Sequence, residues 1–424
     1  MKYITDFHIH SKYSRATSRD MDIPTIAQYA KIKGIDIVAT GDWTHQAWLT
    51  HLKKNLKPLG NGLLKYDNIY FILSTEISCI YKKGDKTRKI HNLIIAPDFK
   101  TIEKINKKLN QIGNLKSDGR PILGLDAKDL AKIALNASKD CIVIPAHIWT
   151  PWFSLFGDKS GFDTIEECFE ELTPYIHAME TGLSSDPGMN WRWSKLDNIT
   201  LISNSDAHSP RKMGREANIL ELEKLSYKNI YKAVCGKHLK LKSNNKLIKT
   251  LEFFPQQGKY HFDGHRACNI CLTPIQTKKH KYICPKCKRP VTVGVMHRVD
   301  ALSDRPGNKQ GSTLKKPQNA APYKNLIPLE EIIANSYGMG PNTKTVAKEY
   351  NNLISNFKNE FNILLNTPRR YLQSAVLNPN IAEGIMRVRK GKVYISPGYD
   401  GEYGKISIFT KQEQGFGKKQ AALF

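Results

Sequence analysis

Short runs of β-forming residues recur along the first 208 residues of the chain, and acidic or imidazole side chains lie on or directly after most of them. The polar positions are His8-Ile9-His10, Asp42, Glu76, His91, His147 and Asp206-Ala207-His208. If the strands are parallel and close into a barrel, their ends meet at one mouth, where barrel enzymes place their chemistry. The sequence therefore predicts a single cluster of oxygen and imidazole groups.

The predicted strands alternate with helical stretches. Strands are expected at residues 3–7, 35–40, 69–75, 89–96, 141–146, 178–180 and 200–205, and helices at 23–33, 127–137 and 164–171. The first helix has Pro24 in its first turn and Gly34 at its end, which is the usual asymmetry of helix boundaries. Alternation of this kind predicts parallel βα units, and about seven of them in roughly 235 residues fit one α/β barrel.

Clustered carboxylates and histidines suit divalent metal ions. Such ions neutralise a phosphate, activate water and stabilise the leaving oxygen in phosphodiester cleavage. A single histidine near a strand end is more often a hydrogen-bonded structural residue, and His91 taken alone would be interpreted in that way. The ordered set on separate strands favours metal binding instead.

The order His-x-His, Asp, Glu, His, His and Asp-x-His resembles the polymerase and histidinol phosphatase (PHP) superfamily. Three longer stretches narrow the resemblance: the segments that begin His147-Ile148-Trp149-Thr150-Pro151, Glu180-Thr181-Gly182-Leu183 and Ser203-Asn204-Ser205-Asp206. Together with the C-terminal half, they resemble the endonuclease Q family of DNA repair enzymes over nearly the whole chain. The resemblance implies a distorted PHP-type βα barrel, then a zinc-ribbon module, then a small, mainly helical C-terminal region.

The resemblance also assigns roles to the polar positions. It implies a catalytic set made of His8, His10, Asp42, Glu76, His91, His147, Asp206 and His208. Within it, His8, His10, Glu76 and Asp206 would hold one metal, Glu76 would bridge to a second held by His91 and His147, and His208 would serve a third. The chain departs from the family pattern at Trp43, where relatives place a histidine, so Asp20 or His45 are the candidates to complete the third site. The metals could be Zn, Mn or Mg.

Two CxxC motifs open the basic half of the chain. Cys268, Cys271, Cys284 and Cys287 leave a twelve-residue loop between the pairs, a spacing that predicts one structural zinc. A disulfide pair is the alternative, but it requires an oxidising compartment. The other four cysteines are expected to be reduced core residues.

The charge of the chain points to a polyanionic partner. The formal net charge is +26, and residues 236–424 carry 32 basic and 12 acidic side chains. A genome that favours lysine would raise the charge evenly, so this asymmetry favours a basic appendage that grips nucleic acid. The candidate DNA-contacting residues are Trp152, Phe153, Lys279, Lys281, Arg289, Gly338 and Gly340. Trp152 and Phe153 could equally pack a loop, and the glycines could join an ordinary helix pair instead of a phosphate-binding helical hairpin.

The predicted domains are a catalytic barrel (1–235), a connecting segment with the zinc module (236–300), a linker (301–325) and a helical, DNA-binding region with a terminal β unit (326–424). The resemblance implies incision on the 5′ side of uracil, hypoxanthine, xanthine or an abasic site, leaving a 3′-hydroxyl and a 5′-phosphate. A small-molecule phosphoesterase of the histidinol phosphatase kind is the alternative. Damaged DNA is the expected partner, and a sliding clamp is a further candidate. The chain is expected to be monomeric. It is also expected to be cytoplasmic, because no run approaches the roughly 20 apolar residues of a membrane span.

Overall fold

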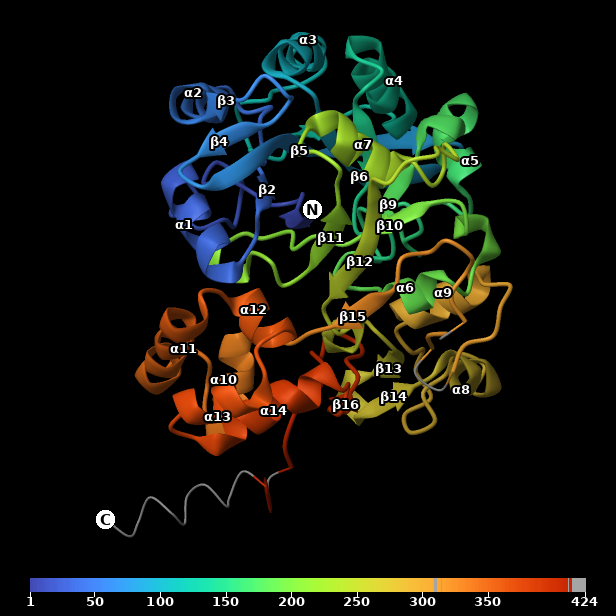
Figure 1. Cartoon of the computed structure of the whole chain (residues 1–424). Coiled ribbons are helices and arrows are strands. Elements are labelled where there is room, and N and C mark those ends of the chain that lie inside the picture. The colour runs from blue at the N-terminus through green and yellow to red at the C-terminus, as the bar shows by residue number, and fades with distance from the viewer. Residues whose placement is uncertain (309–310, 314, 411, 414–424) are drawn as a thin grey trace.

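A twisted sheet, curled into a barrel with helices on its outer surface, forms the upper part of the molecule (Figure 1). The computed structural model describes residues 1–308, 311–313, 315–410 and 412–413. The main sheet contains β1 (Lys2–Asp6), β2 (Ile37–Ala39), β3 (Lys57–Pro58), β4 (Leu64–Tyr66), β5 (Ile69–Lys83), β6 (Lys86–Ala96), β7 (Ile122–Leu123), β8 (Ile142–Pro145), β11 (Ala217–Glu221), β12 (Lys246–Glu252) and β15 (Tyr323–Asn325). A separate parallel pair is formed by β9 (Ala178–Glu180) and β10 (Thr200–Ile202).

Seven helices belong to the described part of the barrel region. They are α1 (Ile23–Lys33), α2 (Gln46–Asn55), α3 (Phe99–Leu109), α4 (Ala127–Ala137), α5 (Ile165–Phe169), α6 (Pro187–Asn190) and α7 (Tyr227–Cys235). The predictions for α1 and α4 are confirmed residue for residue. The Asp22 side chain accepts a hydrogen bond from the Thr25 amide at the start of α1, and Gly34 ends the helix with φ 86°, as the sequence signals require.

The prediction that all strands are parallel is wrong for β6, which runs antiparallel to both β5 and β8. Only Gly84 and Asp85 separate β5 from β6, and Gly84 has φ 60°. A connection this short can join only antiparallel neighbours, because a parallel crossover needs a dozen or more residues. β11 is also antiparallel to its neighbours β1 and β12. The mixed sheet lets β5 run for 15 residues, so Glu76 lies within the strand and not at its end.

The main sheet continues beyond residue 235, the predicted end of the barrel. β12 pairs with β11, and β15 pairs in parallel with β12. The predicted linker also packs on the barrel, where the Arg305 guanidinium binds the Asp197 carboxylate at 2.7 and 2.5 Å. The division of the chain into domains stays a prediction.

The C-terminal region is helical, as predicted. It contains α10 (Leu329–Tyr337), α11 (Lys344–Phe357), α12 (Glu360–Leu365), α13 (Arg369–Ala375) and α14 (Pro379–Arg389), followed by the hairpin of β16 (Tyr394–Ser396) and β17 (Lys405–Ser407). A buried ion pair of 2.7 Å between Lys33 and Glu360 joins it to α1 of the barrel. Residues 411 and 414–424 of the predicted region lie outside the described residues.

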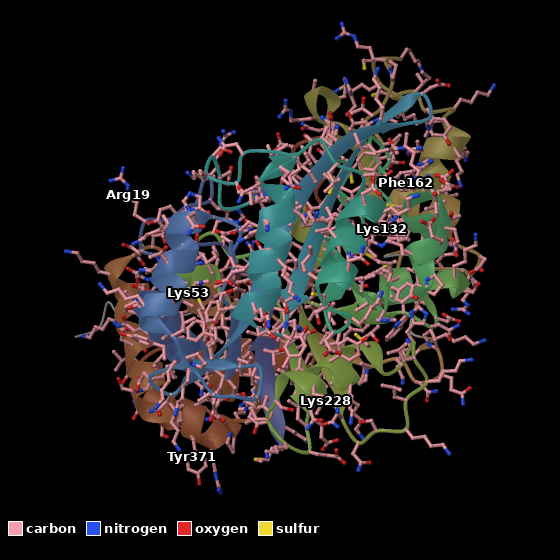
Figure 2. All side chains as sticks on the ribbon, turned by 90° about the horizontal axis from the view of Figure 1, so that it is seen from above. Arg19, Lys53, Lys132, Phe162, Lys228 and Tyr371 are labelled. Atoms are coloured by element: carbon pink, nitrogen blue, oxygen red, sulfur yellow. The ribbon has the colours of Figure 1, made fainter. Side chains whose placement is uncertain are left out.

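Basic side chains also surround the barrel itself. Lys53 on α2, Lys132 on α4 and Lys228 on α7 are exposed on the side seen from above in Figure 2. Within the described residues, no helix is both long and apolar enough to cross a membrane.

Candidate metal centre

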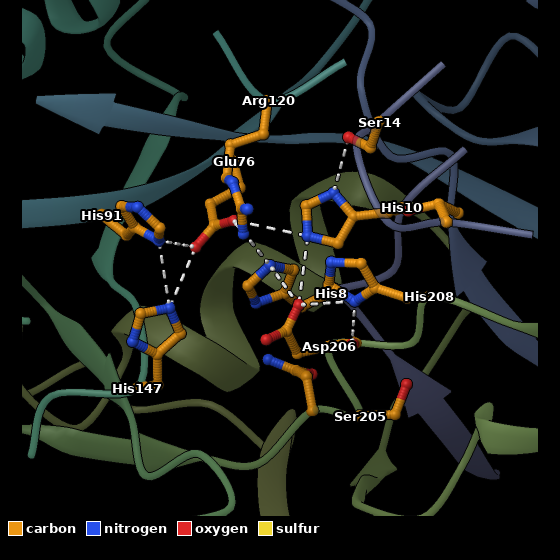
Figure 3. Close-up of polar contacts among 12 residues, drawn as sticks. His8, His10, Ser14, Glu76, His91, Arg120, His147, Ser205, Asp206 and His208 are labelled. Atoms are coloured by element: carbon orange, nitrogen blue, oxygen red, sulfur yellow. Dashed lines mark hydrogen bonds and ion pairs between the residues drawn. The ribbon is translucent and has the colours of Figure 1, made fainter. Parts of the chain in front are cut away.

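Polar side chains from five of the six predicted segments meet at one mouth of the barrel (Figure 3). A parallel bridge between Ile9 and Ala207 joins the two outermost segments, His8-Ile9-His10 and Asp206-Ala207-His208. Asp42, His147 and Asp206 have left-handed φ values of 47°, 32° and 47°. Backbone strain of this kind in non-glycine residues persists where the surroundings fix it, and it is concentrated at functional sites.

The first group of possible ligands is His8, His10, Glu76 and Asp206, whose ligand atoms all lie within 4.8 Å of one another. His10 Nε2 lies 3.0 Å from Asp206 Oδ1 and 3.3 Å from Glu76 Oε2. His8 Nε2 lies 3.6 Å from each of the same two carboxylate oxygens. Two imidazoles and two carboxylates therefore face one point.

The second group consists of Glu76, His91 and His147. Glu76 Oε1 lies 2.7 Å from His91 Nδ1 and 3.0 Å from His147 Nε2. In the β5–β6 register Ser78 faces His91 and Glu76 faces Leu93, so Glu76 and His91 project from the same side of the sheet. Each oxygen of Glu76 thus faces one group, which is the arrangement of a bridging carboxylate.

The burial and hydrogen bonding of these side chains fit metal ligands. His8 is fully buried, and its Nε2 has no hydrogen-bond partner, while its Nδ1 lies 3.0 and 3.1 Å from the Glu180 carboxylate. Burial lowers the pKa of His91 to about 4, so its ring is neutral at pH 7. Burial raises the pKa of Glu76, but the charges of His91, Arg120 and His8 lower it well below its ordinary value. Burial lowers the pKa of His8, His10 and His147, but the carboxylates around them raise it above its ordinary value. Because divalent ions bind neutral imidazole and charged carboxylate, metal binding at these three rings would release protons.

Four of the predicted positions, Asp42, His208, His45 and Asp20, do not complete a third group among the described residues. Asp42 is buried and binds His10 Nδ1 at 3.0 Å and the Ser11 amide at 2.6 Å, so it orients a ligand. The His208 ring lies 4.4 Å from the His10 ring, beside the first group. His45 stacks on Tyr13 at 4.4 Å and lies 3.2 Å from the Lys116 carbonyl. Among the described residues, neither His45 nor Asp20 joins a ligand group.

Two functional positions were missed at the sequence level. Glu180 lies beside His8 Nδ1, and it also accepts hydrogen bonds from the His147 amide at 2.9 Å and from Asn204 Nδ2 at 2.8 Å. It therefore contacts residues of both ligand groups. Arg120 Nη1 lies 3.1 Å from Glu76 Oε2, and its side chain is partly exposed at the mouth. The position of Glu180 at the end of the predicted strand 178–180 was a usable signal for this residue. Nothing in the sequence around Arg120 marks that residue.

The whole chain matches solved structures. The crystal structure of the lesion-specific endonuclease PfuEndoQ from Pyrococcus furiosus superimposes with a TM-score of 0.84 at 32% identity, covering 98% of this chain and 99% of that one. The chain belongs to the endonuclease Q family. A second endonuclease Q structure, a complex with a 27-mer duplex that carries an abasic lesion at the active site, gives the same TM-score and identity and covers 98% of each chain.

Relatives of this endonuclease Q family member also occur among uncharacterised proteins. Protein MJ0043 of Methanocaldococcus jannaschii is 36% identical over 267 residues, which are 61% of this chain and 31% of that protein. The present chain thus spans about a third of the length of MJ0043. A family model described as the MJ0043 C-terminal domain matches residues 328–392. This match coincides with helices α10 to α14.

The cysteine-rich site differs from the prediction in one ligand. His265, Cys268, Cys284 and Cys287 lie close enough to hold one ion, and Cys287 Sγ is 3.5 Å from His265 Nδ1. Cys271 is exposed and does not belong to this group. It lies on β14 (Ile270–Leu272), which pairs with β13 (Asp263–His265). Because side chains alternate along a strand, Leu272 packs against Cys284 and the neighbouring Cys271 faces the other way.

We expect a Cys271→Ser variant to retain its structural metal and a His265→Ala variant to lose it, because a tetrahedral site needs all four ligands. Cobalt substitution measures this directly, since the thiolate-to-cobalt absorption band reports on this site and not on the barrel. Loss of the band in Cys271→Ser together with an unchanged band in His265→Ala would restore the four-cysteine assignment.

In the loop after His147, the ring of Phe153 packs against a ligand and the ring of Trp152 is exposed. Phe153 lies 4.8 Å from the His91 ring, with Lys89 Nζ 5.4 Å above it. Trp152 is 45% exposed and contacts Tyr260 edge to face at 6.3 Å. The loop therefore links the second ligand group to the zinc-module segment.

The remaining DNA-contact candidates are exposed on the outer modules. Lys279, Lys281 and Arg289 are all exposed around α8 (Pro274–Lys279) and the cysteine site. Gly338 ends α10 with φ 63°, and Gly340 has open space around its α-carbon. The helix, turn and helix are thus confirmed, while contact with DNA stays a prediction for these residues.

Replacing Glu180 with glutamine is expected to weaken divalent metal binding in the barrel by about 10- to 100-fold, because the orientation of His8 would be lost. Titration with Mn²⁺, followed by the electron paramagnetic resonance signal of the free ion, gives the affinity. The matched control is Glu171→Gln, whose side chain is 63% exposed. Equal affinities in the two variants would show that Glu180 has no positioning role.

Proposed function

We propose that this protein is a metal-dependent endonuclease that recognises a deaminated base or an abasic site in DNA and cuts the strand on the 5′ side of the lesion. One observation carries the proposal: two ligand groups share Glu76 at the barrel mouth of a chain that matches a lesion-specific endonuclease over 98% of its length. The cut would place a hydroxyl on the 3′ end and a phosphate on the 5′ end.

The chain's own residues would hold the reacting groups in place. Glu180 and Asp42 bind the Nδ1 atoms of His8 and His10, so that both Nε2 atoms point into the site. The Thr150 hydroxyl lies 3.2 Å from His147 Nδ1 and has the same effect on the second group. Divalent ions, when bound, supply a nucleophile from water near neutral pH and neutralise the phosphate. Water would add to phosphorus, the bond from phosphorus to the 3′ oxygen would break, and that oxygen would take up a proton.

Arg120 is the candidate for direct contact with the cleaved phosphate. Its guanidinium lies at the edge of the site beside the bridging carboxylate. A planar guanidinium binds two phosphate oxygens at once and keeps its charge at any working pH. We infer that Arg120 turns from Glu76 to the phosphate when metal ions take over the carboxylate charge.

Trp152 and Phe153 are proposed to contact the lesion or the bases beside it. Their loop directly follows a metal ligand, and Trp152 exposes an aromatic face next to Tyr260. Lys259 Nζ lies 5.6 Å from the Tyr260 ring and 5.8 Å from the Tyr403 ring. Aromatic rings interleaved with lysine are typical of surfaces that stack unpaired bases and follow a phosphate backbone.

The test uses labelled duplexes with a single deoxyuridine, hypoxanthine or abasic site, beside an undamaged duplex, in Mn²⁺ or Mg²⁺. We expect one product that ends just before the lesion and that a polymerase extends, as a 3′-hydroxyl requires. Equal cutting of damaged and undamaged duplexes would contradict lesion recognition. Turnover of a nucleotide monoester without any nicking would favour the small-molecule phosphoesterase.

A further inference from the structure

The described residues enclose a cavity of about 690 Å³ that is separate from the metal centre. It lies where β9 and β10 begin, and its walls come from the end of α7, the start of β12 and residues 317–322. Thr200 and Leu201 of β10 line it, whereas the ligand Asp206 follows the other end of that strand. The cavity and the metal centre therefore occupy opposite ends of one strand.

Lysine side chains dominate the charge of this cavity. Four of them line it: Lys232, Lys237, Lys240 and Lys246. In the described part of the chain, only Lys246 of these four forms an ion pair, with Glu221 at 3.3 Å. The one acidic group in the wall, Asp197, is already held by both nitrogens of Arg305. The cavity thus has a net positive charge, and Asp197 is the acidic wall residue whose charge acts on Lys237.

Lys237 is the innermost of these cations. Its ammonium donates a hydrogen bond to the Ile199 carbonyl at 3.0 Å, and burial lowers its pKa to about 8. A half-buried ammonium with a neutral acceptor as its partner is costly, and a bound anion would remove that cost. An anion of the right size is therefore complementary to this position.

The other wall residues indicate what else the ligand carries. Trp191 and Leu201 are buried and give the cavity an apolar side. Thr200 is buried, and its hydroxyl has no hydrogen-bond partner in the described structure. Because protein atoms enclose this oxygen, it adds no contact for a ligand in the cavity. A ligand with a planar apolar group and phosphates matches the apolar wall and the lysines of this cavity. The volume of the cavity is typical of small-molecule sites.

We propose that this cavity binds a nucleotide, with its phosphates on Lys237, Lys232 and Lys240 and its base against Trp191 and Leu201. The site is independent of the incision proposed above, because it shares no side chain with the ligand groups. The proposed class of ligand is a nucleoside diphosphate, and ADP is the probe.

Isothermal titration of the full-length, zinc-loaded protein with ADP tests the proposal. We expect saturable binding at one site, quenching of tryptophan fluorescence, and about tenfold or weaker affinity in Lys237→Met, as expected for loss of a charge-assisted hydrogen bond to phosphate. Lys228→Met, on the same helix but outside this cavity, is the matched control and should bind as the parent does. Glu76→Gln should also bind as the parent does, which separates this cavity from the metal centre.

The outcomes that would overturn the proposal are distinct. Absence of ADP binding, or equal binding by Lys237→Met and the parent, would refute it. Loss of binding in Glu76→Gln would place the nucleotide at the metal centre instead, and inorganic phosphate binding as tightly as ADP would refute a role for the base. Because methionine removes a poorly partnered buried charge, Lys237→Met should fold at least as stably as the parent. The midpoint of thermal unfolding of the variant, compared with that of the parent, measures this.

Discussion

Glu76→Gln is expected to lower the rate of incision at a deoxyuridine by about 10⁴-fold, which corresponds to several kcal/mol of lost transition-state stabilisation. Glu76 is the one residue that belongs to both ligand groups, with one carboxylate oxygen facing each. Glutamine keeps the shape of the side chain but removes the charge and the bridging ability. Single-turnover cleavage of the labelled duplex measures the change.

Glu171→Gln provides the matched control for that experiment, because the same substitution is made on an exposed side chain. Its incision rate should equal that of the parent. Duplex affinity should also be unchanged in Glu76→Gln, since the DNA-contact candidates lie outside the ligand groups. Incision by Glu76→Gln within tenfold of the parent would show that the shared carboxylate is not needed.

Arg120→Met is expected to lower the single-turnover rate by about 10²- to 10³-fold, the usual cost of removing one donor that stabilises transition-state charge. The side chain carries no ligand atom, so metal content should stay at the parental level. Arg120→Lys should recover part of the rate, because it restores the charge but not the paired hydrogen bonds of a guanidinium. Rate and metal content are measured on the same preparations.

Arg15→Met is the control for Arg120→Met. Arg15 also lies near the barrel mouth and pairs with Asp118 at 3.3 Å, but its side chain is 74% exposed. Its loss should change the rate by less than about threefold, in keeping with the small energies of exposed ion pairs. Equal rate losses in the two variants would mean that Arg120 contributes only general positive charge.

The ligand groups could be predicted from the sequence because each ligand lies next to a strand signal. His8 and His10 follow β1, and Asp206 follows β10, so a barrel topology alone brings them together. The position of His91 required more, since it depends on β6 being antiparallel and on the register with β5. The short turn at Gly84 is the sequence signal that indicates antiparallel pairing of β5 and β6.

The remaining differences from the sequence predictions have a common physical origin in side-chain direction. CxxC spacing cannot show that Cys271 lies on a strand whose alternation turns it away from Cys284. Which four side chains hold the structural ion stays a prediction. Likewise, Arg120 enters the site from a loop, and loop conformation depends on tertiary contacts that spacing does not encode. Glu180 and Asp42 act through hydrogen bonds to ligands, and such partners become visible only in three dimensions.

We expect the barrel mouth to hold metal ions at the two ligand groups. Anomalous diffraction from crystals grown with Mn²⁺, recorded near the manganese edge, locates such ions. Peaks are expected among His8, His10, Glu76 and Asp206 and among Glu76, His91 and His147. The presence of metal ions at the barrel mouth would be contradicted if protein that cuts lesion-bearing DNA in Mn²⁺ gave crystals with no anomalous peak at either group.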